Sequence, residues 1–243
     1  IGKNMRFVKS LIILLEELEK EKENLDKAVE KNVEVIKNGG IIHILGFGSF
    51  NVIPLELFFR PGILACINPI FDINTLYPNS IYKSNYLEKL EGYGKTIIKN
   101  GDIRESDLVY IVSYTGRDII AIDASLEIKK KGAYTVGLIN KENSTKPSKH
   151  SIKKNLKDLV DLPILLPGPS DELLLTLEDK TTKIGPVGNL IALVVLHHIF
   201  SESVLELEKL GIIPPVFRAP INSKNEEINE KLINIYKDRI RIY

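Results

Sequence analysis

The sequence predicts an α/β protein in which helices pack on both faces of a doubly wound parallel sheet. Short, β-branched apolar segments alternate with longer segments whose apolar residues recur every three or four positions. The short segments are apolar throughout, which is typical of strands buried on both faces of a parallel sheet. The longer segments are long enough to form the crossover helices that parallel strands require.

The N-terminal part is expected to form one long helix at 5–37. Its apolar residues recur at three, four or seven positions, and Glu and Lys occupy the opposite face. The sequence NGG at 38–40 ends this helix, because glycine readily adopts the left-handed conformation. The first strand, IIHIL at 41–45, follows, and His43 within it is most simply a core histidine.

The rest of the chain repeats this alternation. The expected order is a helix at 51–59, a strand at 63–70, a helix at 85–100, a strand at 106–113, a helix at 118–131, a strand within 130–140, a strand at 158–167 and a long helix at 187–209. A polar loop at 142–155 and a polar segment after residue 167 connect the last elements. We expect one domain at 5–243, divided into the N-terminal helix, a core at 38–210 and a helical tail at 211–243.

Composition argues against several classes of protein. The 33 basic and 32 acidic residues leave a net charge of +1, so we expect neither nucleic acid nor a membrane as a partner. Cys66 is the only cysteine, which predicts a reducing, cytoplasmic location. The longest apolar run, at 190–200, is too short for a membrane span. No histidine–carboxylate spacing resembles a zinc motif, and we expect no metal or other cofactor.

Residue usage also hints at the source of the chain. Glutamine and tryptophan are absent, whereas Lys, Glu and Ile are abundant. This bias predicts a thermophile, although an AT-rich genome would produce much of it as well.

Two glycine turns mark the expected ligand-binding edge of the sheet. One runs from Gly46 to Phe50 after the first strand, and the other from Ser113 to Asp118 after the third. Ligands of such sheets bind at the carboxyl ends of the strands, where helix N-termini favour anions. The first turn lacks a third glycine at the dinucleotide-binding spacing, which disfavours a dinucleotide-dependent oxidoreductase.

Six segments occur in an order that is familiar: NGGIIHILGFG, INPIF, LEKLEGYGKTI, DIRESDLVYIVSYTGRD, PSKHS and PPVF. Together they resemble the SIS (sugar isomerase) domain family, and within it an uncharacterised branch similar to phosphoheptose isomerases. The resemblance covers nearly the whole chain from about residue 5. It implies a three-layer αβα sandwich with a five-stranded parallel sheet, and a homodimer or homotetramer with sites near subunit interfaces.

The resemblance also implies three loops that hold a phosphate. The third is the start of the long helix, where Val187, Gly188 and Asn189 stand in place of the usual hydroxyl residues. In the first loop Phe50 replaces a serine, and in the second Asp118 replaces a hydroxyl residue. The expected ligand contacts are Gly46, Gly48, Ser49, Ser113, Thr115, Gly116, Arg117 and Asp118, with Glu91 and His150 from two further matching segments.

Some of these positions have a second interpretation. Phe47 and Phe50 cannot donate a hydrogen bond, so the first turn is alternatively repacked without a ligand. Asp118 would repel a phosphate, although Arg117 beside it could offset its charge. Alternatively, Thr115 or Asp118 is the N-cap of the next helix. Glu91 contacts sugar hydroxyls or pairs with Lys95, and His150 is placed to reach the site of a neighbouring subunit.

The catalytic candidates are Glu56, His197 and His198. Glu56 has a place similar to that of the glutamate base of phosphoheptose isomerases, but it is alternatively an ion-pair partner of Arg60, four residues on. The two histidines correspond to an acid/base histidine of those enzymes. Because adjacent helical residues point about 100° apart, one of them at most faces the site. The alternative is a hydrogen-bonded histidine at a subunit interface.

The sequence therefore predicts an SIS-type protein that binds a small phosphosugar or amino sugar. As an enzyme it would interconvert aldose and ketose phosphates through an enediol, with Glu56 as base and His197 or His198 as its partner. The alternative is a non-catalytic sugar-phosphate sensor or assembly protein with degenerate phosphate loops.

Overall fold

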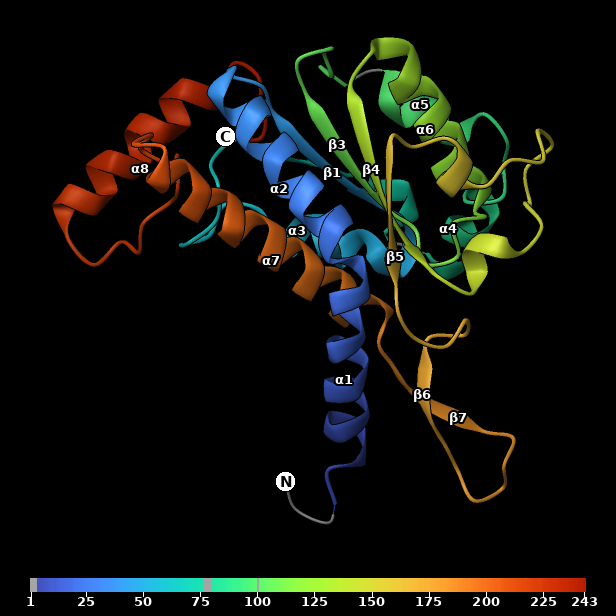
Figure 1. The fold of residues 1–243 in the computed structure, drawn as a ribbon. Helices are drawn as coiled ribbons and strands as arrows, with labels where there is room; N and C mark the ends of the chain where they lie inside the picture. The colour runs from blue at the N-terminus through green and yellow to red at the C-terminus, as the bar shows by residue number, and fades with distance from the viewer. Residues whose placement is uncertain (1–3, 77–79, 100) are drawn as a thin grey trace.

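The computed structural model describes residues 4–76, 80–99 and 101–243, and its centre is a five-stranded parallel sheet (Figure 1). The strand order is β2-β1-β3-β4-β5. The strands are β1 (Ile42–Gly46), β2 (Ile67–Ile70), β3 (Leu108–Val112), β4 (Tyr134–Asn140) and β5 (Leu162–Leu166). The predicted α/β fold with a five-stranded parallel sheet is confirmed.

Helices cover both faces of the sheet (Figure 1). One face packs against α2 (Lys22–Lys37), α3 (Val52–Glu56) and α7 (Gly188–Lys209), and the other against α5 (Tyr93–Lys99) and α6 (Ile119–Lys131). In β3, Tyr110 and Val112 face the first layer, whereas Val109 and Ile111 face the second. This alternation follows from the two-residue period of a strand, and it explains why the strands are apolar throughout.

The helix α7 is a core helix in spite of its composition. It is the one helix of the described residues that is long and apolar enough to cross a membrane, with a mean hydropathy of 1.7 over 18 residues. However, 44% of that window is buried in the protein, and Ile191, Val195 and Ile199 belong to the main core. Packing against α2 and the sheet thus accounts for part of its apolar character.

Three of the predicted helices are wrong in extent. The segment 5–37 is divided into α1 (Arg6–Glu16) and α2 by a 3₁₀ turn, Glu17–Glu21. In this turn Glu21 accepts a hydrogen bond from the Leu165 N–H of the edge strand β5, at 3.1 Å. The interruption of the helix thus places the Glu21 carboxylate where it accepts from an N–H of β5 that has no partner strand on that side.

The predicted helix at 85–100 is two helices, α4 (Ile81–Leu87) and α5. Gly92 lies between them at φ +91°, a left-handed conformation that ends a helix and suits glycine. The predicted helix at 51–59 is reduced to the five residues of α3, which follow a 3₁₀ turn at Gly48–Asn51.

The sequence did not predict the hairpin of β6 (Leu173–Thr176) and β7 (Lys183–Pro186), which lies in the segment expected to be polar connection. The hairpin and α1 project together from the sheet (Figure 1). They pack where Gly185 meets Phe7, since a Cβ at position 185 would lie 2.8 Å from the phenylalanine ring. Contact with α1, which local sequence does not reveal, accounts for this element.

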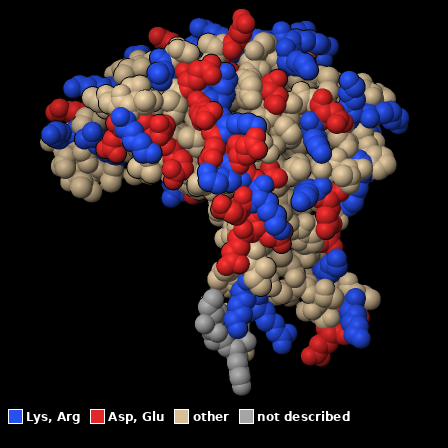
Figure 2. All heavy atoms as spheres, viewed as in Figure 1, with Lys and Arg blue, Asp and Glu red and all other residues tan. Residues whose placement is uncertain are grey.

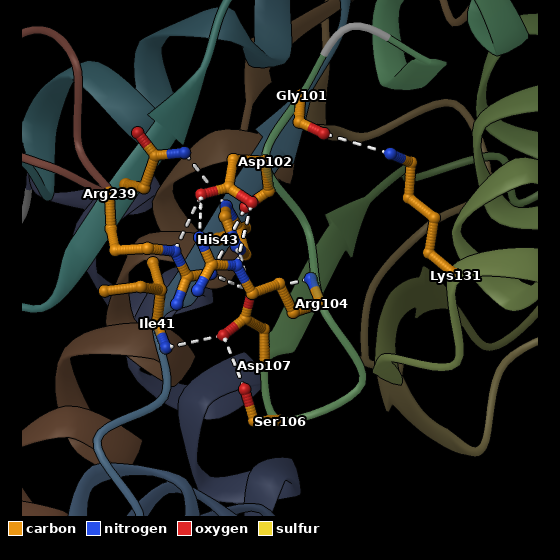
Figure 3. Close-up of polar contacts among 10 residues, drawn as sticks. Ile41, His43, Gly101, Asp102, Arg104, Ser106, Asp107, Lys131 and Arg239 are labelled. Atoms are coloured by element: carbon orange, nitrogen blue, oxygen red, sulfur yellow. Dashed lines mark hydrogen bonds and ion pairs between the residues drawn. The ribbon is translucent and has the colours of Figure 1, made fainter.

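The C-terminal tail contains α8 (Ser223–Tyr236) and is fixed to the amino ends of the central strands by a partly buried charged cluster (Figure 3). Arg239 donates to Asp102 Oδ2 at 2.8 Å and to Asp107 Oδ2 at 2.6 Å. His43 Nε2 lies 3.1 Å from Asp107 Oδ2, so His43 is a core histidine, as predicted. The bounds of the single domain, 5–243, stay a prediction.

The cluster determines the ionisation of Asp107. Burial by itself would raise the pKa of this carboxyl group, but hydrogen bonds from His43 and from the backbone N–H groups of Ile41 and Arg104 lower it to about 2. The native state therefore binds the proton more weakly than the unfolded chain does. Asp107 stabilises the fold above its unfolded pKa, and this contribution is lost as the pH falls through the folded value.

We predict that Asp107→Asn lowers the free energy of unfolding by about 3 kcal/mol at pH 7, because it removes one member of a buried ion pair. The difference from wild type should shrink by about 2–3 kcal/mol between pH 5 and pH 2, where Asp107 itself becomes protonated. Urea unfolding followed by circular dichroism over this pH range measures the difference in unfolding free energy. Asp238→Asn, an exposed position, is the control, and a pH-independent difference for Asp107→Asn would contradict the assignment.

Candidate functional site

The topological switch point of the sheet lies between β1 and β3. The chain leaves β1 to form β2 on one side and later returns to form β3 on the other. Gly46 is paired with Val112, so the turns that follow the two strands emerge next to each other. Doubly wound sheets bind their ligands at this position. The two glycine turns predicted from the sequence therefore flank the crevice of the fold.

The β1 turn is tightly packed. A Cβ at Gly46 would overlap the backbone carbonyl of Phe50, and Gly48 has a left-handed φ of +55°. Asn51 holds the turn by donating its side-chain amide to the carbonyl oxygens of Gly48, at 3.1 Å, and Thr75, at 3.2 Å. A side chain at Gly46 would displace the backbone, and one at Gly48 would be strained.

The two phenylalanines of the β1 turn point to opposite layers. Phe47 packs with the core under α5 and α6, whereas Phe50 packs against the core under α7. The Phe50 ring stacks on Tyr114 of the β3 turn, with centroids 6.3 Å apart and planes 13° apart. On the α7 side, the space between the two strand ends is thus occupied by an aromatic pair.

The β3 turn satisfies its own hydroxyl groups. Ser113 Oγ donates to Asp118 Oδ2 at 2.8 Å and accepts from the Gly116 N–H at 3.1 Å. Thr115 Oγ1 accepts from the Arg117 N–H at 3.1 Å. Gly116 has φ +62° and lies against Ile139, so a side chain would be strained there. The turn is preorganised, and its Thr115 hydroxyl still has a hydrogen to donate.

Asp118 stands at the N-cap position of α6 without capping it. Its side chain makes no hydrogen bond to the helix and instead lies 3.2 Å from Lys149 Nζ. Arg117 Nε donates to the Pro147 carbonyl at 2.5 Å. The interpretation of Asp118 as a helix cap is therefore wrong, and both charged residues of this turn hold the loop that contains residues 147–149.

The start of α7 lies against both turns. A Cβ at Gly188 would lie 3.0 Å from Phe50 Cζ and 3.2 Å from Tyr114 Cδ2. Asn189 donates its side-chain amide to the Ser49 carbonyl at 3.1 Å. The three loops expected from the family resemblance thus meet at one place. We call this place the junction, formed by Ser49, Phe50, Tyr114, Gly188 and Asn189.

A carboxylate of the chain itself occupies the junction. Glu172, which precedes the hairpin, directs its carboxylate to Gly188, where a Cβ would overlap Oε2. Burial raises the pKa of Glu172, and a hydrogen bond from the Gly188 N–H opposes this rise. Sequence reasoning missed this residue because its segment was assigned as polar connection. No local pattern identifies this contact, because it is made by tertiary packing.

The structure brings together two of the three catalytic candidates. His197 Nε2 lies 3.9 Å from Glu56 Oε1, and Glu56 also pairs with Arg60, as the alternative interpretation predicts. His198 points elsewhere, into a groove of about 750 Å³ between α2 and α7. His197 follows Gly188 by nine residues, which is about 14 Å along a helix axis. Within one chain, the Glu56–His197 pair therefore lies away from the junction.

Glu91 and His150 belong to a network that fixes the polar loop. Glu91 accepts hydrogen bonds from the N–H and Oγ of Ser151, both at 2.7 Å, and these lower its pKa. His150 is buried and lies 3.1 Å from Asp123, which also accepts from the Gly92 N–H. Both side chains are thus engaged within the chain, and the reach of His150 to a neighbouring subunit stays a prediction. Ligand contact by either residue stays a prediction.

No cluster of three or more His, Cys, Asp or Glu side chains suitable for a metal ion occurs among residues 4–76, 80–99 and 101–243. The polar groups of the junction are instead hydroxyls, amides, backbone N–H groups and one carboxylate. Groups of this kind recognise an organic ligand by hydrogen bonding.

Comparison with known proteins agrees with this geometry. Residues 6–140 match the family model described as SIS domain. A UPF0309 protein of Geobacillus sp. (strain WCH70) is 32% identical over 226 residues, covering 93% of this chain and 92% of the relative. A UPF0309 protein of Thermoanaerobacter pseudethanolicus is also 32% identical and covers 92% of this chain and 94% of its own.

Among solved structures, the phosphoheptose isomerase of Neisseria gonorrhoeae superposes with a TM-score of 0.51. The sequence identity is 15%, and the match covers 81% of this chain and 94% of that chain. At this identity the likeness concerns the fold alone.

We predict that His150→Ala lowers the free energy of unfolding by about 1–3 kcal/mol, because Asp123 loses a buried hydrogen-bond partner. Urea unfolding measures this loss, and limited proteolysis should show faster cleavage within 142–155. His198→Ala, at an exposed position, serves as control. Unchanged stability of His150→Ala would instead favour a role in ligand contact.

Proposed function

Because this chain belongs to the SIS domain family, we propose that it binds a phosphorylated sugar at the junction. The observation that carries the proposal is the convergence of the β1 turn, the β3 turn and the start of α7 at the switch point. A helix N-terminus presents unpaired N–H groups and a favourable dipole to an anion. The carboxylate of Glu172 at Gly188 supports the proposal, because an anionic group already occupies this position.

Polar groups around the junction suit the hydroxyl groups of a sugar. Within the described chain, the Oδ1 atoms of Asn51 and Asn189 are buried and have no hydrogen-bond partner. An unsatisfied buried acceptor is costly, and a ligand hydroxyl would satisfy it once the side chain turns towards the ligand. Ser49 is exposed and Thr115 half-buried, so their hydroxyls are accessible as further donors.

Isomerisation is a second candidate, which the proximity of Glu56 and His197 favours. In this reaction Glu56 removes the C2 proton of an aldose phosphate and returns it to C1 through an enediol. His197 moves the other proton between the O1 and O2 atoms. The geometry supports binding more strongly than turnover, because Arg60 holds Glu56 and the pair lies along α7 from the junction.

Self-association is part of the proposal, because apolar side chains are exposed on α1, α3 and α7. They are Val8, Ile12 and Ile13 of α1, Val52 and Leu55 of α3, and Leu190 and Val194 of α7. Figure 2 shows Lys and Arg intermixed with Asp and Glu over the face in view, so neither sign dominates it. Where exposed apolar side chains adjoin, such surface is typical of contacts between proteins.

We predict that at least one of a set of hexose, heptose and N-acetylhexosamine phosphates raises the melting temperature. At a concentration of 100 times its Kd, a ligand should raise it by about 5–10 °C in a chain of this length. Thr115→Val should weaken binding by about tenfold, since it removes a hydroxyl donor. Thr96→Val, a surface position on α5, is the matched control. No shift with any sugar phosphate would refute the proposed binding.

Turnover is tested separately, with a sugar phosphate that binds. An isomerase exchanges the C2 proton of its substrate for deuterium in D₂O, which proton NMR follows directly. We predict that Glu56→Gln abolishes any such exchange and that His198→Gln leaves it unchanged. Binding without exchange above background identifies a sensor rather than an enzyme.

A further inference from the structure

We propose that Glu172 is an intramolecular competitor for the anionic group of the ligand. Its carboxylate occupies the start of α7 in the unliganded protein and has to leave before a ligand phosphate binds there. This inference rests on the proposed function and adds to it a residue that regulates access to the junction. None of the three loops expected to hold the phosphate contains this residue.

The position of the carboxylate is the first support. It lies against Gly188, the first residue of a 22-residue helix, where Phe50 Cζ and Tyr114 Cδ2 would also contact a Cβ. Burial raises the pKa of this carboxyl group, whereas the nearby Gly188 N–H lowers it. The carboxylate thus uses the N–H group and the helix dipole that a phosphate would use. Two anions cannot share them, because like charges a few Å apart repel each other strongly.

The backbone conformation of Glu172 shows that its surroundings hold the residue in place. Its φ is +59°, in the left-handed region that residues with a Cβ avoid. Two hydrogen bonds hold it: its N–H donates to the Pro169 carbonyl, and its carbonyl accepts from the Val187 N–H, both at 2.9 Å. Such conformations persist where the surroundings impose them, and they concentrate at ligand sites and switches.

The Glu172 carboxylate can move away from Gly188 without a change in the backbone. Glu172 is half-buried, and its side chain rotates about three bonds, so the carboxylate can swing towards solvent while its backbone bonds stay in place. The neighbouring Asp171 has a different partner, because its Oδ2 lies 2.5 Å from Lys183 Nζ. Adjacent acidic residues therefore have separate roles, one in the hairpin and one in the junction.

The competing explanation is that Glu172 is a permanent structural cap of α7. A variant that removes its charge distinguishes a cap from a competitor. Glu172→Gln keeps the side-chain length and one acceptor oxygen, so it retains a cap, but it removes the negative charge. A competitor multiplies the apparent affinity by the fraction of time that the site is free, so weakening the competitor raises the affinity by up to the inverse of that fraction. Asp171→Asn removes the same charge one residue away and is the matched control.

The experiment titrates wild type, Glu172→Gln and Asp171→Asn with inorganic phosphate and with the set of sugar phosphates. Binding is read from the amide NMR signal of Gly188 and from calorimetry. We expect Glu172→Gln to bind inorganic phosphate at least about tenfold more tightly than wild type. Asp171→Asn should match wild type, and urea unfolding of each variant verifies that it is folded.

The outcomes separate this inference from the function on which it rests. Equal or weaker binding of sugar phosphates by Glu172→Gln, with clear binding by wild type, overturns the competitor and leaves the proposed function standing. Tighter inorganic phosphate binding by Glu172→Gln, with no sugar phosphate bound by any variant, supports the competitor and overturns the function. Absence of all binding in all three proteins overturns both.

Discussion

The pairing of β1 with β3 is the constraint on which the rest of the site depends. Because Gly46 is in register with Val112, the turns after these strands emerge together at the one edge where the chain direction diverges. The α7 helix then packs its N-terminus against both turns. A shift of one residue in this register would exchange the faces of the strand and separate the turns. The architecture of the sheet, rather than any single side chain, thus assembles the junction.

The interior of the junction differs from what a simple anion site would contain. Hydroxyl groups of the β3 turn bond within the turn, an aromatic pair covers the α7 side, and the Glu172 carboxylate sits at the helix start. Each of these features gives the polar or apolar groups of the unliganded junction a partner within the chain. An empty polar crevice would leave N–H groups unsatisfied and helix dipoles exposed, which is unfavourable. Contacts within the chain offset this cost. Ligand binding is then an exchange of internal contacts for external ones.

Much of the fold was accessible from the sequence, because buried parallel strands and crossover helices have distinct periodicities. The five strands and the position of the two glycine turns follow from such local patterns. The hairpin did not, since its residues are partly or fully exposed and it depends on contact with α1. The break at Glu17–Glu21 was equally hidden, because its partner, Leu165, is 144 residues away.

The candidate site was predictable in place but not in detail. Glycines and hydroxyls in a recurring order identify the loops, but only the three-dimensional structure shows which groups are already engaged. Asp118 bonds to Ser113 and Lys149 rather than capping α6, and His150 is committed to Asp123. Glu172 comes from a segment with no periodic pattern, so its proximity to Gly188 is purely a tertiary fact. Long-range side-chain pairing is the information that local sequence lacks.

Mapping a bound sugar phosphate by amide NMR tests the central claim most directly. If the junction is the ligand site, chemical-shift changes should concentrate at three segments distant in sequence, 46–51, 113–118 and 187–189. Small changes elsewhere would be expected only next to these segments. Changes confined to the groove between α2 and α7, with the three segments unaffected, would show that the ligand binds elsewhere and would contradict the account.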